Sequence, residues 1–276
     1  MMLIFWLACQ NAQKNDDSAV ATEATPAIPD FPLSQCGLRE YNLLPTDTMG
    51  TIVSSERRDE FSFSKEALQA LYNSFDFPLP QPETGVETHF IQYTTQDKGE
   101  EVLATGLIVI PTDIEEEMLT VLWEHFTLGL NDTCAPTAIG IAGAAHPVLF
   151  ASLGNVVVAP DYIGMSGWRG ESDTLHPYIV AEPTAIASLD SLRALHHFVE
   201  DEAPDIRIRK DHMVIWGASE GGFASLFTDR YLPHYAPEFE SKATVAAIPP
   251  TDVLWLAKYG TEHLGETTLG ILGSIT

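Results

Sequence analysis

Residues 217–222 read GASEGG and lie between an apolar run and a run with helical character. The apolar run, MVIW at residues 213–216, has the composition of a buried strand, and residues 223–231 continue as a helix. A G-x-S-x-G sequence between a strand and a helix predicts a nucleophile elbow, a sharp turn that exposes the serine hydroxyl above the sheet. Its glycines let the backbone turn where a Cβ atom would clash. The pattern therefore predicts a nucleophile at Ser219, although the same letters also occur in ordinary glycine-rich turns.

A serine nucleophile needs hydrogen-bond donors for the oxyanion that forms during acyl transfer. The backbone N–H of Glu220 follows the serine at the start of the predicted helix, where N–H groups are free and the helix dipole favours negative charge. A second donor is expected from the loop after the strand predicted at residues 119–125. We favour the backbone N–H of Thr127 or of Leu128, and the sequence does not decide between them.

Strands and helices alternate along most of the chain. The run NVVVAP at residues 155–160 is apolar throughout, as in strands that are buried on both faces of a parallel sheet. Further strands are predicted at residues 89–94, 102–110, 119–125, 213–216 and 243–248, and helices near 64–68, 145–153, 182–200 and 223–231. This alternation predicts an α/β fold with a mainly parallel sheet and flanking helices.

Composition excludes several classes of function. The 276 residues include 39 acidic and 14 basic side chains, for a formal net charge of −25. Nucleic-acid binding is not expected from such a chain, because neutralising phosphates requires Lys and Arg. No G-x-G-x-x-G sequence opens a helix, and P-loop, CxxC and HExxH sequences are missing. The sequence therefore predicts neither a nucleotide cofactor nor a metal ion.

The first nine residues, MMLIFWLAC, are apolar and end at Cys9. This segment is too short to span a bilayer and lacks the basic start of a signal peptide. Its last three residues resemble the end of a bacterial lipobox, in which the cysteine is lipidated after cleavage. Residues 10–32 have the composition of a flexible tether. We therefore expect an extracytoplasmic protein, either a cell-envelope lipoprotein or a secreted one; the alternative is an apolar N-terminus without a role.

Two cysteines, Cys36 and Cys134, remain if Cys9 carries a lipid. In an oxidising compartment the two can form a disulfide. The alternatives are two free thiols or a partner elsewhere, and spacing alone does not choose among them.

Three motifs follow one another in the order found in a known family. They are GLNDTCAP at residues 129–136, APDYIG at residues 159–164 and the serine turn. From about residue 85 to its end, the chain resembles the secretory lipase family of α/β-hydrolases. The resemblance implies an α/β-hydrolase fold and hydrolysis of carboxylic esters, lipids included, with Ser219 as the nucleophile and no cofactor. The bulky residues at 125–127 depart from the small ones expected beside the oxyanion.

The acid and the base of the triad follow the serine on loops after later strands in this fold. After Ser219 the sequence predicts one more strand, and residues 250–276 resemble the start of a lid. We therefore expect the hydrolase domain, residues 33–276, to be incomplete, with its acid and base beyond Thr276. Asp252 and His263 stand in the right order but have no strand between them. The alternative is a helix-capping aspartate and a surface histidine.

Three classes of function remain open. The leading hypothesis is a serine esterase or lipase, in which Ser219 attacks an ester carbonyl and forms an acyl-enzyme. The second is a non-catalytic protein with the same fold, or one inactivated by truncation. The third is a peptidase or an acyltransferase, because the turn defines the nucleophile but not the leaving group. The acyl length of the substrate is not readable from the sequence.

Overall fold

A computed structural model describes residues 43–170, 172 and 174–263. Residues Leu43–Pro249 form one compact unit, and the described residues 250–263 belong to a second unit. The signal-like segment, the tether, Cys9 and Cys36 lie outside the described residues. No helix in the described part of the chain is both long and apolar enough to cross a membrane.

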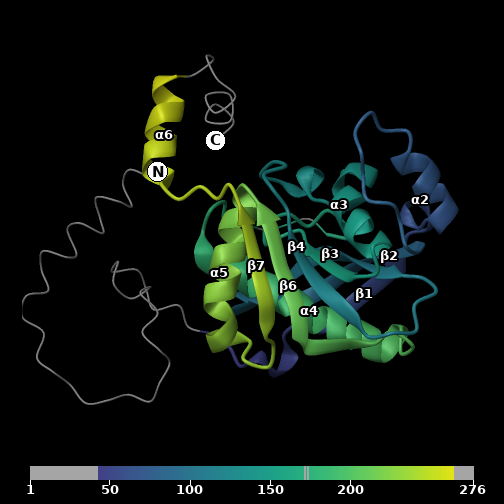
Figure 1. The fold of residues 1–276 in the computed structure, drawn as a ribbon. Coiled ribbons are helices and arrows are strands. Elements are labelled where there is room, and N and C mark those ends of the chain that lie inside the picture. The colour runs from purple at the N-terminus through teal and green to yellow at the C-terminus, as the bar shows by residue number, and fades with distance from the viewer. Residues whose placement is uncertain (1–42, 171, 173, 264–276) are drawn as a thin grey trace, which may run out of the picture. The chain divides into compact units, whose positions relative to one another are not determined.

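A seven-stranded mixed sheet forms the centre of the larger unit, with the order β1-β2-β3-β5-β4-β6-β7 (Figure 1). Neighbours from β1 to β5 are antiparallel, and those from β5 to β7 are parallel. The parallel part carries the predicted serine turn. The strands are β1 (Ile52–Arg57), β2 (Val86–Asp97), β3 (Glu100–Pro111), β4 (Met118–Glu124), β5 (Val156–Pro160), β6 (Ile208–Ala218) and β7 (Ser241–Ala247).

Helices cover both faces of the sheet. On one face, α2 (Lys65–Tyr72) and α3 (Ile141–Ser152) pack with alternate strand residues such as Phe90 and Trp123 in a common apolar cluster. On the other face lie α4 (Ala181–Glu202) and α5 (Glu220–Tyr235). Tyr93, which points away from Phe90 across the sheet, donates a hydrogen bond to a carbonyl of α4 at 2.9 Å. The layers are those expected for an α/β fold.

Local sequence accounts for several elements. Ser64 caps α2, since its hydroxyl accepts a hydrogen bond from Ala67 N at 3.3 Å, as predicted. Every residue of β5 is buried, which matches its uniformly apolar sequence. A two-residue turn, Lys98-Gly99, joins β2 to β3, and both of its residues have positive φ. Such turns match the twist of the flanking strands.

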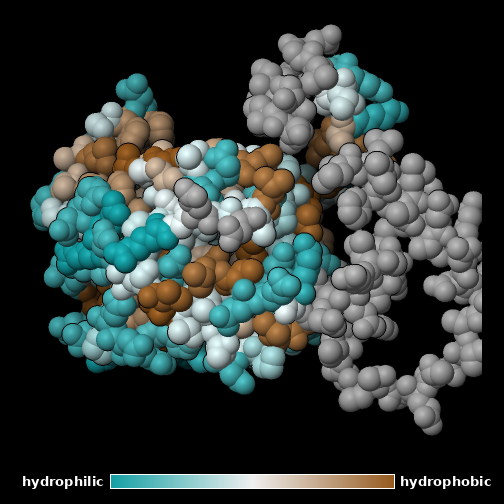
Figure 2. Space-filling model, turned by 180° about the vertical axis from the view of Figure 1, so that it is seen from behind, coloured by the Kyte–Doolittle hydropathy of each residue, from teal (hydrophilic) through white to brown (hydrophobic). Residues whose placement is uncertain are grey.

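The structure differs from the predicted elements mainly in length. Strands β2 and β3 each have 12 residues, well beyond the predicted runs. β1 was not predicted at all, because its sequence IVSSER is largely polar and it is held by its pairing with β2. Figure 2 shows hydrophobic side chains in several separate groups among hydrophilic ones on the face opposite to that of Figure 1.

The second unit contains one described helix, α6 (Val253–Glu262). Asp252 caps it, because its Oδ1 accepts a hydrogen bond from Trp255 N at 2.8 Å. The helix extends the helical run expected from residue 252 onward.

Candidate active site

Ser219 occupies a strained turn between a strand and a helix. β6 ends at Ala218 and α5 begins at Glu220, and the serine between them has φ 55° and ψ −118°. A positive φ is costly for a residue with a Cβ atom and persists only where the surroundings enforce it. Here Ser219 N donates to the carbonyl of Ala247 at 2.9 Å, and Ser219 O accepts from Phe223 N at 3.0 Å. Both neighbours hold the serine above the carboxyl ends of the strands.

The glycines of the turn are needed for close packing. A Cβ atom on Gly217 would overlap the carbonyl of Gly221, and a Cβ on Gly221 would overlap the carbonyl of Glu124. A Cβ on Gly222 would lie 2.6 Å from the carbonyl oxygen of Ala247. The turn is therefore pressed against the ends of β4 and β7, and the glycines serve this approach as well as the bend itself.

The three predicted oxyanion donors lie on two segments. Glu220 is the first residue of α5, and the loop with Thr127 and Leu128 follows β4. This loop starts against the serine turn, because a Cβ on Gly221 would lie 2.8 Å from the carbonyl oxygen of His125. In the turns, loops and helix caps of the described residues, the backbone N–H groups of Glu220, Thr127 and Leu128 donate to no backbone carbonyl. The choice between Thr127 and Leu128 stays a prediction.

A buried contact between a histidine and a glutamate lies directly beside the nucleophile candidate. His176 Nε2 is 2.8 Å from Glu220 Oε1, with side chains that are 0% and 3% exposed. His176 Nδ1 donates to the carbonyl of Ile163 at 3.0 Å. Sequence reasoning missed this pair, because 44 residues separate its members and His176 stands in no recognisable motif. The only available signal was an acidic residue next to the serine.

The APDYIG segment shapes the loop after β5. Asp161 is fully buried and accepts hydrogen bonds from Thr105 Oγ1 at 2.6 Å and from the backbone N–H and hydroxyl of Thr137. Burial raises the pKa of Asp161 to about 6, although these donors oppose the shift. Tyr162 has φ 67° and donates from its hydroxyl to the carbonyl of His125 at 3.2 Å. The segment therefore ties β3, β5 and the loop after β4 together.

Two further titratable groups lie buried at the end of β4. Burial raises the pKa of Glu124 to about 7, and its Oε1 accepts a hydrogen bond from Thr228 Oγ1 at 2.6 Å. Burial lowers the pKa of His125, whose ring nitrogens face the carbonyls of Phe126 at 2.8 Å and of Asp161 at 3.3 Å. A neutral ring has one N–H and therefore donates to only one of these two carbonyls.

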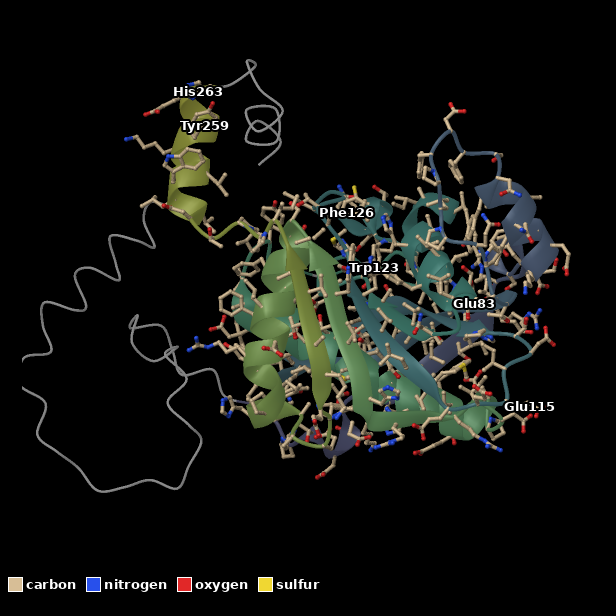
Figure 3. The ribbon with its side chains drawn as sticks, in the orientation of Figure 1. Glu83, Glu115, Trp123, Phe126, Tyr259 and His263 are labelled. Atoms are coloured by element: carbon tan, nitrogen blue, oxygen red, sulfur yellow. The ribbon has the colours of Figure 1, made fainter. Side chains whose placement is uncertain are left out.

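An aromatic cluster lines the loop after β4. Trp123 and Phe126, labelled in Figure 3, lie at the carboxyl end of β4 with ring centroids 6.5 Å apart. The ring of His146 stacks on Trp123 at 5.5 Å and meets Phe126 at 5.8 Å. Burial lowers the pKa of His146, so that its neutral ring suits this apolar setting. The bulky Phe126 therefore packs inward from the loop.

Asp252 and His263, the weaker alternative for the acid and the base, do not meet. Asp252 and His263 flank the ten-residue α6, which is about 15 Å long. Asp252 caps one end, and His263 at the other end contacts the carbonyl of Tyr259 at 2.9 Å and stacks on its ring at 4.1 Å (Figure 3). Their helix-end positions match the alternative reading. Within residues 43–249, no histidine side chain is hydrogen-bonded to Ser219.

Two further predictions from the sequence concern Cys134 and metal binding. Cys134 Sγ donates to Asn131 Oδ1 at 3.6 Å. Because Cys36 lies outside the described residues, a disulfide between the two stays a prediction. In the described part of the chain, no group of three or more His, Cys, Asp or Glu side chains is placed to hold a metal ion.

Comparison with known proteins gives a consistent result. The sequence model of the secretory lipase family matches residues 146–265, which include the APDYIG motif and the serine turn but not GLNDTCAP. The rice cell wall degrading esterase LipA from Xanthomonas oryzae has 25% identity and a TM-score of 0.68, covering 82% of this chain and 57% of LipA. No curated protein matches this chain.

Two more solved structures share the fold. A putative hydrolase from Legionella pneumophila has 22% identity and a TM-score of 0.64, covering 78% of this chain and 56% of its own. Candida antarctica lipase A in its closed state has 18% identity and a TM-score of 0.51, covering 80% of this chain and 47% of its own. The chain therefore spans little more than half the length of LipA and of the Legionella hydrolase.

The fold and its neighbours define the class. The chain has the α/β-hydrolase fold, as predicted. Within that class, its resemblance to the secretory lipase family, which the motifs had indicated, is confirmed.

Proposed function

We propose that this chain carries the nucleophile and the oxyanion donors of a serine hydrolase that cleaves carboxylic esters. The observation that carries the proposal is the conformation of Ser219, whose positive φ at the start of α5 is enforced by three glycines and two backbone hydrogen bonds. Strain of this kind persists only where the surroundings enforce it, and it clusters at active sites. The similarity to secretory lipases supports an ester as the substrate.

In the proposed reaction, Ser219 Oγ attacks the carbonyl carbon of the ester and its proton passes to a base. The carbonyl oxygen becomes an oxyanion, which accepts hydrogen bonds from Glu220 N–H and from Thr127 or Leu128 N–H. Collapse of this intermediate expels the alcohol and leaves an acyl-enzyme, which water then hydrolyses to the free acid. Donors that are free before the reaction need no reorganisation when the charge develops.

A non-catalytic role is the second candidate, and one observation favours it. No histidine within residues 43–249 is hydrogen-bonded to Ser219, whereas an efficient serine hydrolase needs a base there. A peptidase or an acyltransferase would use the same nucleophile and donors, so only turnover of defined substrates separates those activities from an esterase.

We also propose that the protein acts outside the cytoplasm. The matching family is described as secretory, and the sequence around Cys9 resembles a lipobox. Mass spectrometry of envelope fractions tests the lipoprotein form: we expect a mature N-terminus at a lipidated Cys9. An N-terminus at Met1, with Cys36 and Cys134 both alkylatable, would contradict it.

The test of the nucleophile is labelling of the purified chain with a fluorophosphonate, followed by peptide mapping. We expect the phosphonyl group on Ser219 and no label in Ser219→Ala. Ser74→Ala is the matched control, because this exposed serine on the chain after α2 bonds only to the carbonyl of Leu71. Undiminished labelling of Ser219→Ala would show that the serine is wrongly chosen.

A further inference from the structure

The segment between β5 and α4 contacts both sides of the proposed oxyanion site. His176 reaches Glu220 at the start of α5, and Tyr178 OH lies 2.9 Å from Thr127 Oγ1 in the loop after β4. The segment approaches closely only because Gly164 has φ 79° and no side chain: a Cβ there would overlap the backbone of His176. His176 and Tyr178, which contact the two donor segments, are thus only two positions apart in the segment between β5 and α4.

Hydrogen-bond chemistry fixes the proton count of the His176–Glu220 pair. The carbonyl of Ile163 only accepts, so Nδ1 of His176 carries a hydrogen. An ionised carboxylate also only accepts, so the 2.8 Å contact between Nε2 and Oε1 requires one more proton. With that proton on either atom, the pair has no net charge. The histidine therefore neutralises the carboxyl group of Glu220.

This neutralisation matters because of where Glu220 stands. Its backbone N–H is the proposed donor to the oxyanion, and its own side chain is buried, with Oε2 lacking a partner among the described residues. A buried carboxylate without a counter-charge would oppose the negative charge that develops at the same residue. The proton shared by the pair removes this repulsion, and the contact with His176 also fixes the first residue of α5.

Tyr178 acts on the opposite donor segment. Its hydroxyl contacts the side chain of Thr127, whose backbone N–H is one of the two candidate second donors. The rings of His176 and Tyr178 lie 6.1 Å apart, and the ring of His176 stacks on Tyr162 at 5.8 Å. The loop after β4 is therefore coupled to the same segment as the start of α5.

We propose that His176 and Tyr178 are positioning residues that hold the two donor segments at the distance an oxyanion requires, His176 also cancelling the charge of Glu220. This inference rests on the proposed function, because it concerns the reaction at Ser219. Misplacement of a donor by about 1 Å can cost on the order of 10²-fold in rate.

The test is a double-mutant cycle read by the rate of phosphonylation of Ser219. His176→Gln leaves the carboxylate of Glu220 without a counter-charge and is expected to slow labelling by about 30-fold, less than the 10²–10³-fold of losing a donor outright. Glu220→Gln has no charge at this position, so its labelling rate should fall by about 3-fold or less. The double variant should return to the rate of Glu220→Gln, because amide now faces amide.

Controls separate positioning from folding. His197→Gln removes a similar bond, from Nδ1 to the carbonyl of Gly50 at 2.8 Å, on a different part of the unit, and should label at the wild-type rate. Tyr178→Phe should slow labelling by about 10-fold. Tyr72→Phe, which loses a buried hydroxyl contact to Ser152 Oγ at 3.1 Å, should not. Circular dichroism melts identify any variant that has unfolded.

The outcomes are distinct. Recovery of the rate in the double variant supports charge neutralisation by His176. A double variant as slow as His176→Gln, or a wild-type rate in both His176→Gln and Tyr178→Phe, would overturn the inference while leaving Ser219 as the nucleophile. Labelling that survives in Ser219→Ala would remove the proposed function itself.

Discussion

At the scale of single residues, the turn around Ser219 requires glycines, because there is no room for their Cβ atoms. Gly221 lies against the carbonyls of Glu124 and His125, so any side chain there must push β4 away from α5. The sequence predicted the serine and its glycines, because a strand, a turn and a helix are local patterns. It did not predict the role of His176, because the contact with Glu220 depends on how the segment between β5 and α4 packs against the turn.

Gly221→Ala should therefore destabilise the protein and abolish labelling of Ser219. The new methyl group overlaps main-chain atoms that cannot move aside, and we expect a loss of about 3 kcal/mol or more in the free energy of unfolding. Urea denaturation measures it. Gly170→Ala is the control, since its nearest neighbour would lie at an ordinary 3.5 Å. Equal midpoints for the two variants would contradict the packing argument.

Glu124 gives a prediction about pH. Its pKa is raised by burial to about 7, from 4.5 in its ordinary state, so the folded protein binds a proton that the unfolded chain releases. The stability due to this proton is complete below pH 4.5 and is lost as the pH rises through about 7. Glu124→Gln keeps a neutral side chain at every pH.

Urea midpoints of wild type and Glu124→Gln at pH 5 and pH 8 test this sign. The variant should gain stability relative to wild type on going from pH 5 to pH 8, by on the order of 2 kcal/mol. If the two proteins differed by the same free energy of unfolding at both pH values, burial would not raise the pKa of Glu124.

At the scale of elements, the sequence predicted the parallel half of the sheet better than the antiparallel half. A strand such as β5 is apolar throughout, so its composition alone identifies it. Strand β1 is polar and exists because β2 offers it a hydrogen-bonding edge, which is a property of the sheet. Helix α4 was predicted nearly in full, since its buried leucines recur at helical spacing.

The β2–β3 turn offers a test at this scale. Lys98 has φ 52° beside Gly99 at φ 81°, a pair of conformations that favours Asn-Gly over Lys-Gly. Lys98→Asn should raise the free energy of unfolding by about 0.5 kcal/mol. The ion pair that it removes, between the exposed Lys98 and Asp97 at 3.4 Å, is open to solvent at its lysine end and contributes little. Gly99→Ala should have the opposite effect, and a stabilising Gly99→Ala would contradict the assigned turn.

At the scale of the whole molecule, the proposed nucleophile and its proposed donors lie within residues 43–249, and no described residue of that unit is assigned as their base. The order of triad residues after Ser219 is an expectation from the family. Asp252 and His263 cap opposite ends of α6, so their side chains do not contact each other. The sequence could not reveal this, since helix length and capping decide which ends can meet.

Because no histidine within residues 43–249 is hydrogen-bonded to Ser219, the oxyanion donors and binding alone are expected to give about 10³–10⁴-fold over water for that unit. Added imidazole, as an external base, should then accelerate labelling of Ser219. The measurement is the labelling rate against imidazole concentration, with Ser219→Ala as the blank. Fast labelling of the wild type that does not respond to imidazole would contradict this expectation.

A crystal structure of the phosphonylated chain tests the role of Ser219 as the nucleophile most directly. We expect a covalent bond from phosphorus to Ser219 Oγ, with the phosphonyl oxygen about 2.7–3.1 Å from Glu220 N and from either Thr127 N or Leu128 N. An adduct on another residue, or a phosphonyl oxygen that points away from Glu220 N, would contradict the assignment of this turn as the catalytic centre.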